Sequence, residues 1–290
     1  MLKILILGAT GMLGNTLFRY LAEDKNMTVH GTIRSRTSFQ YFPNRLFSQL
    51  IPNINVENNE SLESVFNIIQ PEVVVNCIGV VKQLAESKDP LISIPINALF
   101  PHKLAALCEM RGARLVHIST DCVFSGAKGD YLESDFPDAN DLYGRSKFLG
   151  EVDCSNTITL RTSIIGHELL GQRSLLNWFL SQQHSVKGFT KAVFSGLPTI
   201  ELSRIIRHFV IPNPLLRGLY HVASKPITKY DLLQLIAKTY KKTIDIIPSD
   251  SLVIDRSLNA ERFNKETGYI TPDWPELIKY MYDFKNRIDL

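Results

Sequence analysis

The chain has 290 residues, of which 44% are hydrophobic and 21% charged, so it can bury the core of one large domain or of two closely joined ones. A net charge of +3 without a long basic run excludes an electrostatic track for nucleic acid, and no apolar stretch is long enough to predict a membrane span. The four cysteines lack the spacing of a metal or redox site, so we expect a reduced, cytoplasmic protein that binds no metal.

Short apolar runs rich in β-branched residues alternate with longer amphipathic stretches in the first half of the chain. Strands that are apolar on both faces and separated by helices indicate a parallel sheet covered on both sides. The pattern predicts an α/β fold, namely a Rossmann-type doubly wound parallel sheet with a smaller, interleaved C-terminal substrate-binding domain. The expected strands are residues 3–8, 28–33, 73–79, 114–120 and 157–163.

A glycine-rich turn, "LGATGMLG", follows the first expected strand and precedes an amphipathic helix. Gly8, Gly11 and Gly14 have the spacing GxxGxxG, which allows a tight turn and a close approach of the backbone to a ligand. The start of the helix offers free N–H groups to a pyrophosphate. This combination predicts a dinucleotide site, although a glycine trio can also serve only a turn and close helix packing.

The end of the second expected strand indicates which dinucleotide binds. An acidic side chain there would hold the ribose 2′-hydroxyl of NAD, but the sequence has Arg34, Ser35 and Arg36 and no carboxylate nearby. A guanidinium can pair with the 2′-phosphate that only NADP carries. We therefore expect NADPH, with NADH less favoured; the alternative is that the arginines only solvate a loop.

Acid–base residues are expected at the carboxyl end of strand 114–120 and on the helix that follows. Ser119 and Thr120 end that strand, where a hydroxyl can bond a substrate carbonyl. Tyr143 and Lys147 are four residues apart, so on a helix they share one face. Tyr143 could then give a proton to an oxygen that gains charge, while Lys147 lowers the pKa of the phenol.

The alternation of strands and helices becomes less regular in the second half of the chain. We expect residues 1–165 to form the NADP-binding Rossmann domain and residues 166–290 to form mainly a substrate-binding domain. Part of the second half should return to the sheet within residues 195–225. The Gly-led stretch 218–224 is the best candidate for that returning strand.

Four motifs in order, "GATGMLG", "STDCVF", "YGRSK" and "LNAERFNKETGYITPDW", resemble the extended short-chain dehydrogenase/reductases. Within them the chain looks most like the dTDP-4-dehydrorhamnose reductase group, also called RmlD-like, and the likeness covers residues 3–280. The resemblance implies NADPH-dependent reduction of the C4 ketone of a nucleotide-linked 4-keto-6-deoxy sugar. Such reactions supply precursors of capsule, O-antigen and other cell-surface polysaccharides.

The resemblance also implies roles for individual residues. Thr120, Tyr143 and Lys147 match the catalytic Ser/Thr, Tyr and Lys, and Lys147 is also expected to hold the nicotinamide ribose. Asn97 matches a structural Asn in the helix before the catalytic strand. The full set expected to bind the cofactor is Gly8, Thr10, Gly11, Met12, Leu13, Arg34, Ser35, Arg36, Asn55, Val56, Cys77, Ile78, Gly79, Asn97, Ser119, Tyr143 and Lys147.

Substrate contacts are expected at Cys122, Val123, Phe124, Arg256 and Arg262. Either arginine could pair with a substrate diphosphate or could simply be solvated, and the Cys122 side chain could equally serve packing. A nucleotide sugar is the expected partner. Neither nucleic acid nor a membrane is expected, and the chain should be a monomer or a homodimer.

The chain departs from the family pattern at positions that would face the sugar. Cys122 stands where relatives commonly have Tyr, and "NCIGVVKQ" replaces an alanine-rich turn. A dTDP-linked and a UDP-linked substrate are therefore both compatible with the sequence. Two other functions stay open: an epimerase or dehydratase with tightly bound NAD, and a catalytically silent regulatory subunit like that of methionine adenosyltransferase.

Overall fold

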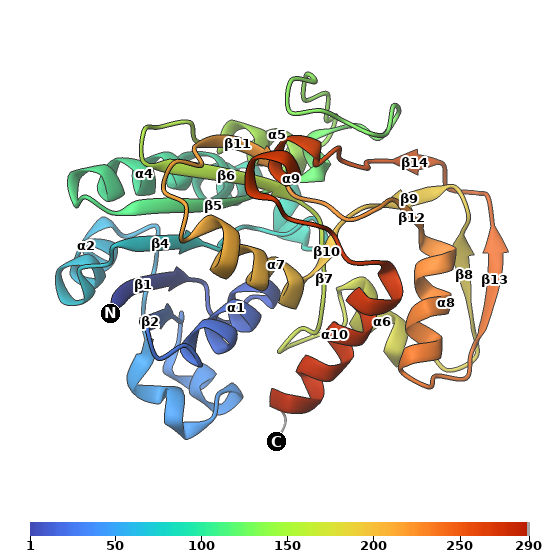
Figure 1. The fold of residues 1–290 in the computed structure, drawn as a ribbon, viewed down its shortest axis with the longest axis horizontal. Coiled ribbons are helices and arrows are strands. Elements are labelled where there is room, and N and C mark those ends of the chain that lie inside the picture. Colours follow the sequence, from blue (N-terminus) through green and yellow to red (C-terminus); the bar gives the residue numbers. More distant parts are fainter. Residues whose placement is uncertain (289–290) are drawn as a thin grey trace.

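The computed structural model describes residues 1–288, and a seven-stranded parallel sheet occupies the centre of the molecule (Figure 1). The strand order reverses between β1 and β4, and ligands of such sheets bind at the carboxyl ends of the strands near that point. From edge to edge the strands are β11 (Gly218–His221), β6 (Thr157–Thr162), β5 (Arg114–Thr120), β4 (Val73–Asn76), β1 (Leu2–Leu7), β2 (Met27–Thr32) and β3 (Leu50–Ile51).

The predicted fold class is confirmed. Each of the five expected strands forms within one to three residues of its predicted ends, and the 218–224 segment supplies β11, which pairs in parallel with β6. β3 was not predicted because it contributes only two residues, held at the sheet edge by its pairing with β2. The division of the chain into two domains at residue 165 stays a prediction.

Helices cover both faces of the sheet. Alternate side chains of β1 enter opposite apolar layers, Ile4 and Ile6 in one and Leu5 and Leu7 in the other, as the two-residue period of a strand requires. The first layer is closed by α1 (Met12–Ala22), α7 (Thr199–Ile205) and α10 (Trp274–Ile288). The second is closed by α2 (Asn59–Ile69) and α4 (Phe100–Met110).

One continuous helical stretch runs through α3 (Pro90–Ser93), the π-helical segment η4 (Ile94–Leu99) and α4. Its length and composition would allow it to cross a membrane, but 56% of its apolar window is buried inside the protein, where it contributes Phe100 and Leu104 to the core. Pro95 is the second residue of the π-helical segment, and a proline has no N–H to complete a regular α-helical bond.

The remaining elements form a smaller lobe beside the sheet, at the right of Figure 1. Its strands are β9 (Ala192–Phe194), which pairs with β12 (Ile227–Thr228) and β14 (Ile254–Asp255), and the parallel pair β8 (Ser185–Phe189) and β13 (Asp245–Ser249). The helices α6 (Leu175–Ser181) and α8 (Lys229–Thr239) pack in this lobe, whereas α9 (Glu261–Thr267) contacts β11.

Short segments connect these parts. β7 (Ile164–Ile165) and β10 (Leu197–Pro198) pair in parallel, and α5 (Leu142–Leu149) packs against η4 and β5. The short helical turns are η1 (Arg36–Tyr41), η2 (Asn44–Gln49), η3 (Ala85–Lys88), η5 (Asp121–Val123) and η6 (Ile206–Val210).

Candidate active site

The glycine turn packs so closely that two of its positions have no room for a side chain. A Cβ on Gly14 would lie 2.1 Å from the carbonyl oxygen of Gly8, and Gly8 itself has a φ of +84°, in the left-handed region. Gly11 caps α1 without a side-chain hydrogen bond, so no capping side chain occupies the N–H groups of the first turn. The turn therefore offers backbone donors to a phosphate, and Thr10, Met12 and Leu13 lie within it.

The segment after β4 forms the wall between this turn and α5. A Cβ on Gly8 would meet the Ile78 side chain at 2.9 Å, next to the backbone of Cys77. A Cβ on Gly79 would lie 3.8 Å from the Nζ atom of Lys147. Cys77, Ile78 and Gly79 thus lie between the glycine turn and Lys147, the predicted catalytic lysine, although these segments are far apart in sequence.

Asn97 fixes that wall from the π-helical segment. Its Oδ1 accepts a bond from the backbone N–H of Val80 at 2.9 Å, and its Nδ2 donates to the Val80 carbonyl at 3.2 Å and to Ser146 Oγ at 3.3 Å. The side chain is 1% exposed. Asn97 therefore connects the loop after β4 to α5 and holds these two segments in place.

The residues expected around the adenosine part of the cofactor lie beyond β2 and β3. Arg34, Ser35 and Arg36 are exposed, and Ser35 caps η1 by accepting a bond from the N–H of Thr37 at 3.2 Å. Asn55 is also exposed, whereas Val56 is buried in the core beside α2. Two exposed guanidinium groups thus flank a hydroxyl at the end of β2.

The strand end and α5 bring Thr120, Tyr143 and Lys147 together. Asp141 caps α5 by accepting a bond from the N–H of Gly144 at 2.8 Å, which sets the helix against the β5 end. Tyr143 is half-buried, and its phenol interacts with the Thr120 hydroxyl. Lys147 is 5% exposed and donates to the carbonyl of Ile118 at 2.8 Å.

Burial changes the pKa values of both Tyr143 and Lys147. It raises the pKa of Tyr143 above its ordinary value, with the nearby Cys122 acting in the same direction, and this outweighs the lowering by Thr120. That Lys147 lowers the pKa of the phenol stays a prediction; its ammonium donates to the Ile118 carbonyl. Burial also lowers the pKa of Lys147 to about 8.

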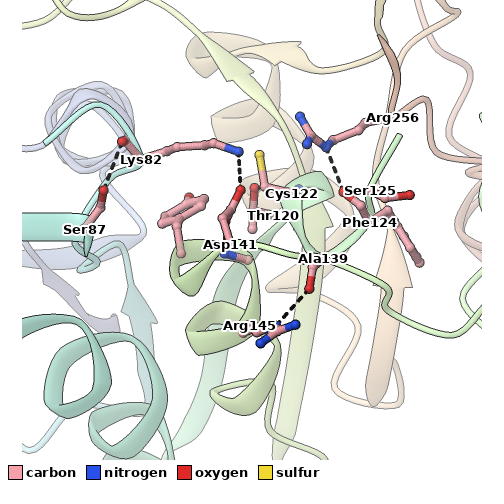
Figure 2. Close-up of polar contacts among 12 residues, drawn as sticks. Lys82, Ser87, Thr120, Cys122, Phe124, Ser125, Ala139, Asp141, Arg145 and Arg256 are labelled. Carbon is pink, nitrogen blue, oxygen red and sulfur yellow. Dashed lines mark hydrogen bonds and ion pairs between the residues drawn. The ribbon is translucent and has the colours of Figure 1, made fainter. Parts of the chain in front are cut away.

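Cationic side chains from three segments surround the β5 end. Lys82 Nζ lies 2.6 Å from Asp141 Oδ2, and Arg256 Nε donates to the Phe124 carbonyl at 2.7 Å, as Figure 2 shows. Lys229 is the first residue of α8. Burial lowers its pKa, and the nearby charge of Asp121 offsets this only in part. An anionic group in this region would meet Lys82, Lys229 and Arg256.

Some expected substrate residues occupy other surroundings. Arg262 lies at α9, where it pairs with Glu266 at 3.2 Å and its guanidinium covers the ring of Tyr220, so the structure does not bring it to Arg256. Val123 and Phe124 are fully buried in a small apolar cluster with Tyr131 and Leu258. Cys122 is half-buried beside Thr120, to whose Oγ1 its N–H donates at 3.1 Å.

Ser119 points away from its neighbour Thr120, because successive residues of a strand face opposite sides. Its hydroxyl donates to Glu151 Oε1 at 2.7 Å instead of facing Tyr143. The sequence interpretation missed Glu151, Asp121 and Lys229. Asp121 and Glu151 carried a signal, since Asp121 falls inside "STDCVF" and Glu151 lies four residues after the lysine of "YGRSK". Lys229 is placed only by the fold.

Within residues 1–288, no group of three His, Cys, Asp or Glu side chains could hold a metal ion. The four cysteines, which lie in the described part of the chain, are free thiols.

Comparison with known proteins places this geometry in a family. Residues 2–283 match the model of the RmlD substrate binding domain. The dTDP-4-dehydrorhamnose reductase of Escherichia coli strain K12 is 27% identical over 311 residues, covering 97% of each chain. Methionine adenosyltransferase 2 subunit beta of Danio rerio is 26% identical over 266 residues, covering 87% of this chain and 76% of that one. Matches to the mouse, rat and cattle forms of that subunit span 41% of their length.

Solved structures share the fold. A dTDP-4-dehydrorhamnose reductase from Bacillus anthracis in complex with NADP superposes with a TM-score of 0.79 at 20% identity, covering 98% of this chain and 99% of that one. A dTDP-glucose 4,6-dehydratase from the same organism in complex with NAD gives 0.79 at 16% identity, covering 99% and 97%. The family match over residues 2–283 and the shared fold lead to one conclusion: the chain belongs to the RmlD family of extended short-chain dehydrogenase/reductases, as its motifs predicted.

Proposed function

We propose that the protein is an NADPH-dependent reductase of the C4 ketone of a nucleotide-linked 4-keto-6-deoxy sugar, dTDP- or UDP-linked. The product would be a precursor for capsule, O-antigen or another cell-surface polysaccharide, made in the cytoplasm. The observation that carries the proposal is the Tyr143 phenol beside the Thr120 hydroxyl, with Lys147 one turn along α5 and facing Gly79. The E. coli relative, named dTDP-4-dehydrorhamnose reductase, supports this substrate class.

The residues present fit a dinucleotide. Gly8 and Gly14 leave no space for a Cβ, so the backbone at the start of α1 can approach a pyrophosphate. The exposed guanidinium groups of Arg34 and Arg36 suit a 2′-phosphate, which favours NADPH over NADH. When bound, NADPH supplies the hydride.

The side chains then handle the ketone oxygen. Tyr143 gives its proton to that oxygen, and its raised pKa keeps the phenol protonated at neutral pH, as a proton donor must be. Thr120 orients and polarises the carbonyl through its hydroxyl. Lys147 holds the nicotinamide ribose with its ammonium group.

The substrate diphosphate would bind among the cationic side chains at the β5 end. Arg256 is fixed by its bond to the Phe124 carbonyl, and Lys82 and Lys229 reach the same region from other segments. Asp121 lies among them, and burial raises the pKa of its carboxyl. Three cations beside the carboxyls of Asp121 and Asp141 still leave a net positive charge for a diphosphate.

A second candidate function is a regulatory subunit without turnover of its own. It is favoured by the likeness to methionine adenosyltransferase 2 subunit beta. The presence of Thr120, Tyr143 and Lys147 in one group favours the reductase instead.

The test is NADPH oxidation, followed by absorbance, with dTDP-, UDP- and GDP-linked 4-keto-6-deoxy sugars. We expect consumption of NADPH with a dTDP- or UDP-linked member and little with the GDP-linked one. A protein that binds NADPH but oxidises it with none of these sugars would instead support the regulatory function.

A further inference from the structure

A buried ion pair joins β6 to the residue that follows the end of α5. The Nε and Nη2 atoms of Arg161 donate to the two carboxylate oxygens of Glu151, each at 2.7 Å, and Ser119 Oγ donates to the same carboxylate at 2.7 Å. The side chains of Arg161 and Glu151 are 3% and 10% exposed. Because two parallel bonds connect the two planar groups, the position of the guanidinium is fixed.

The guanidinium of Arg161 also lies over the ring of Phe124. Its Cζ atom is 5.2 Å from the ring centroid, and the Phe124 ring stacks on Tyr131, with centroids 4.0 Å apart and an angle of 9° between the planes. His221 on β11 touches all three residues. Its Nε2 lies 3.3 Å from Arg161 Nη1, its Nδ1 lies 3.0 Å from the Tyr131 carbonyl oxygen, and its ring meets that of Phe124 edge-on at 5.9 Å. The fully buried Phe124 is thus held by an arginine, a tyrosine and a histidine.

Phe124 connects this buried group to Arg256. Its backbone carbonyl accepts the bond from Arg256 Nε at 2.7 Å that Figure 2 shows. The neighbouring residue Ser257 accepts a bond at its carbonyl from the N–H of Tyr131 at 2.9 Å. The two residues with stacked rings therefore also hold the Arg256 segment through their backbones. A shift of the rings would displace the acceptor of the Arg256 side chain.

A second buried carboxylate in the chain offers a comparison. Glu201 pairs with Arg204 at 3.0 Å on α7, and the Arg204 guanidinium lies 4.7 Å from the ring centroid of Tyr280 on α10. This group has the same components, namely a buried carboxylate, an arginine and an aromatic ring. It joins α7 to α10, however, and not to the loop that holds Arg256. The two ion pairs can therefore separate a local role from a general contribution to stability.

We propose that Arg161 is a positioning residue for Arg256: fixed by Glu151, its guanidinium holds the Phe124 ring, so that the Phe124 carbonyl keeps Arg256 oriented toward the substrate diphosphate. The binding of the diphosphate by Arg256 rests on the function proposed above. The control of Arg161 over Arg256 through Phe124 does not depend on it.

The first test measures the Nε–H group of Arg256 by NMR in the protein without ligands. Arginine is labelled with nitrogen-15, and the Arg256 signal is assigned by its loss in Arg256→Met. Arg161→Lys keeps a charge opposite Glu151 but has no planar guanidinium to cover the ring, so we expect the Arg256 Nε–H to exchange with solvent about ten times faster or more. Arg204→Lys is the matched control, because it makes the same change opposite Glu201, and it should leave the exchange rate within about twofold.

The second test uses kinetics to show whether Arg161 acts through Arg256. Arg161→Lys should raise the KM for the nucleotide sugar about 3- to 10-fold and leave the Kd of NADPH unchanged. When Arg256 is already replaced by Met, the same change should have little further effect, because residues that act through one contact are not additive. An equal rise in KM with and without Arg256 would overturn the proposal.

Phe124→Leu covers the case in which Arg161→Lys does not fold, since it removes the ring and leaves the Arg161–Glu151 pair intact. It should accelerate the exchange of the Arg256 Nε–H in the same way. An unchanged exchange rate in both variants, or an equal acceleration in Arg204→Lys, would overturn the proposal. Faster exchange in a protein that reduces none of the keto sugars would retain this inference and reject the reductase.

Discussion

Tyr143 and Lys147 lie one turn apart on α5, and burial pushes their acid–base properties in opposite directions. The pKa of the phenol is raised, so the neutral proton donor is favoured, and the pKa of the amine is lowered to about 8, so its charge depends on its neighbours. Each residue therefore has its own partner. Thr120 faces the phenol, while the Ile118 carbonyl accepts a hydrogen bond from the ammonium.

Removing the Tyr143 hydroxyl tests its role as proton donor. Tyr143→Phe keeps the half-buried ring, so the fold and the cofactor site should be retained. We expect turnover to fall roughly 10²- to 10⁴-fold, the usual contribution of a general acid. Steady-state kinetics with NADPH and the active sugar gives the turnover, and fluorescence titration gives the dissociation constant of NADPH. Turnover equal to that of the unchanged protein would contradict the role of Tyr143 as proton donor.

The strand–turn–helix unit at β1 and α1 depends on contacts that only glycine permits. At Gly14 a Cβ would collide with the backbone of Gly8 at 2.1 Å, and a backbone atom cannot move aside as a flexible side chain can. At Gly11 the same Cβ would lie 3.4 Å from that carbonyl oxygen, an ordinary contact, and φ is −71°. The two glycines of one motif therefore serve different purposes.

Substituting each glycine by alanine separates packing from binding. Gly14→Ala should lower the free energy of unfolding by about 1–3 kcal/mol, because α1 must shift away from β1. Gly11→Ala should retain the stability of the unchanged protein, so any loss of NADPH affinity in it reports the phosphate site alone. Thermal or urea unfolding checks both variants. Equal stability of the two would contradict the close packing.

At the scale of the whole molecule, the chain returns twice to the catalytic end of the sheet. β11 pairs with β6 and carries His221 behind Arg161, and the segment after β14 brings Arg256 to the Phe124 carbonyl. Figure 1 shows that both returns come from the second half of the chain. The site is therefore completed by residues on both sides of the predicted boundary at residue 165.

The two late arginines provide a matched pair for the substrate side. Arg256→Met should raise the KM for the nucleotide sugar roughly 10- to 100-fold, the range for losing a charged hydrogen bond, with NADPH affinity unchanged. Arg262→Met should change neither value by much, because Arg262 is engaged with Glu266 at α9. Kinetics of both variants checks this. A larger rise in KM for Arg262→Met than for Arg256→Met would instead indicate that Arg262 binds the diphosphate.

The sequence predicted the parts of this molecule that local pattern determines. The strands were found because β-branched apolar runs are typical of buried parallel strands, and Tyr143 and Lys147 were paired because helical spacing places them on one face. β3 and the π-helical segment escaped prediction, since two residues at an edge and a proline-widened turn leave little periodic signal. The Arg161–Glu151 pair escaped because it joins two elements whose contact only the folded sheet defines.

The central claim is that a hydride passes from NADPH to C4 of the sugar. The most direct measurement uses NADPH carrying deuterium at the transferable position of its nicotinamide, incubated with the protein and the active keto sugar, with the product analysed by NMR and mass spectrometry. We predict one deuterium per product molecule, bound to C4, and one NADPH consumed for each. Deuterium at another carbon, or conversion of the sugar without NADPH consumption as in an enzyme with tightly bound NAD, would contradict the account.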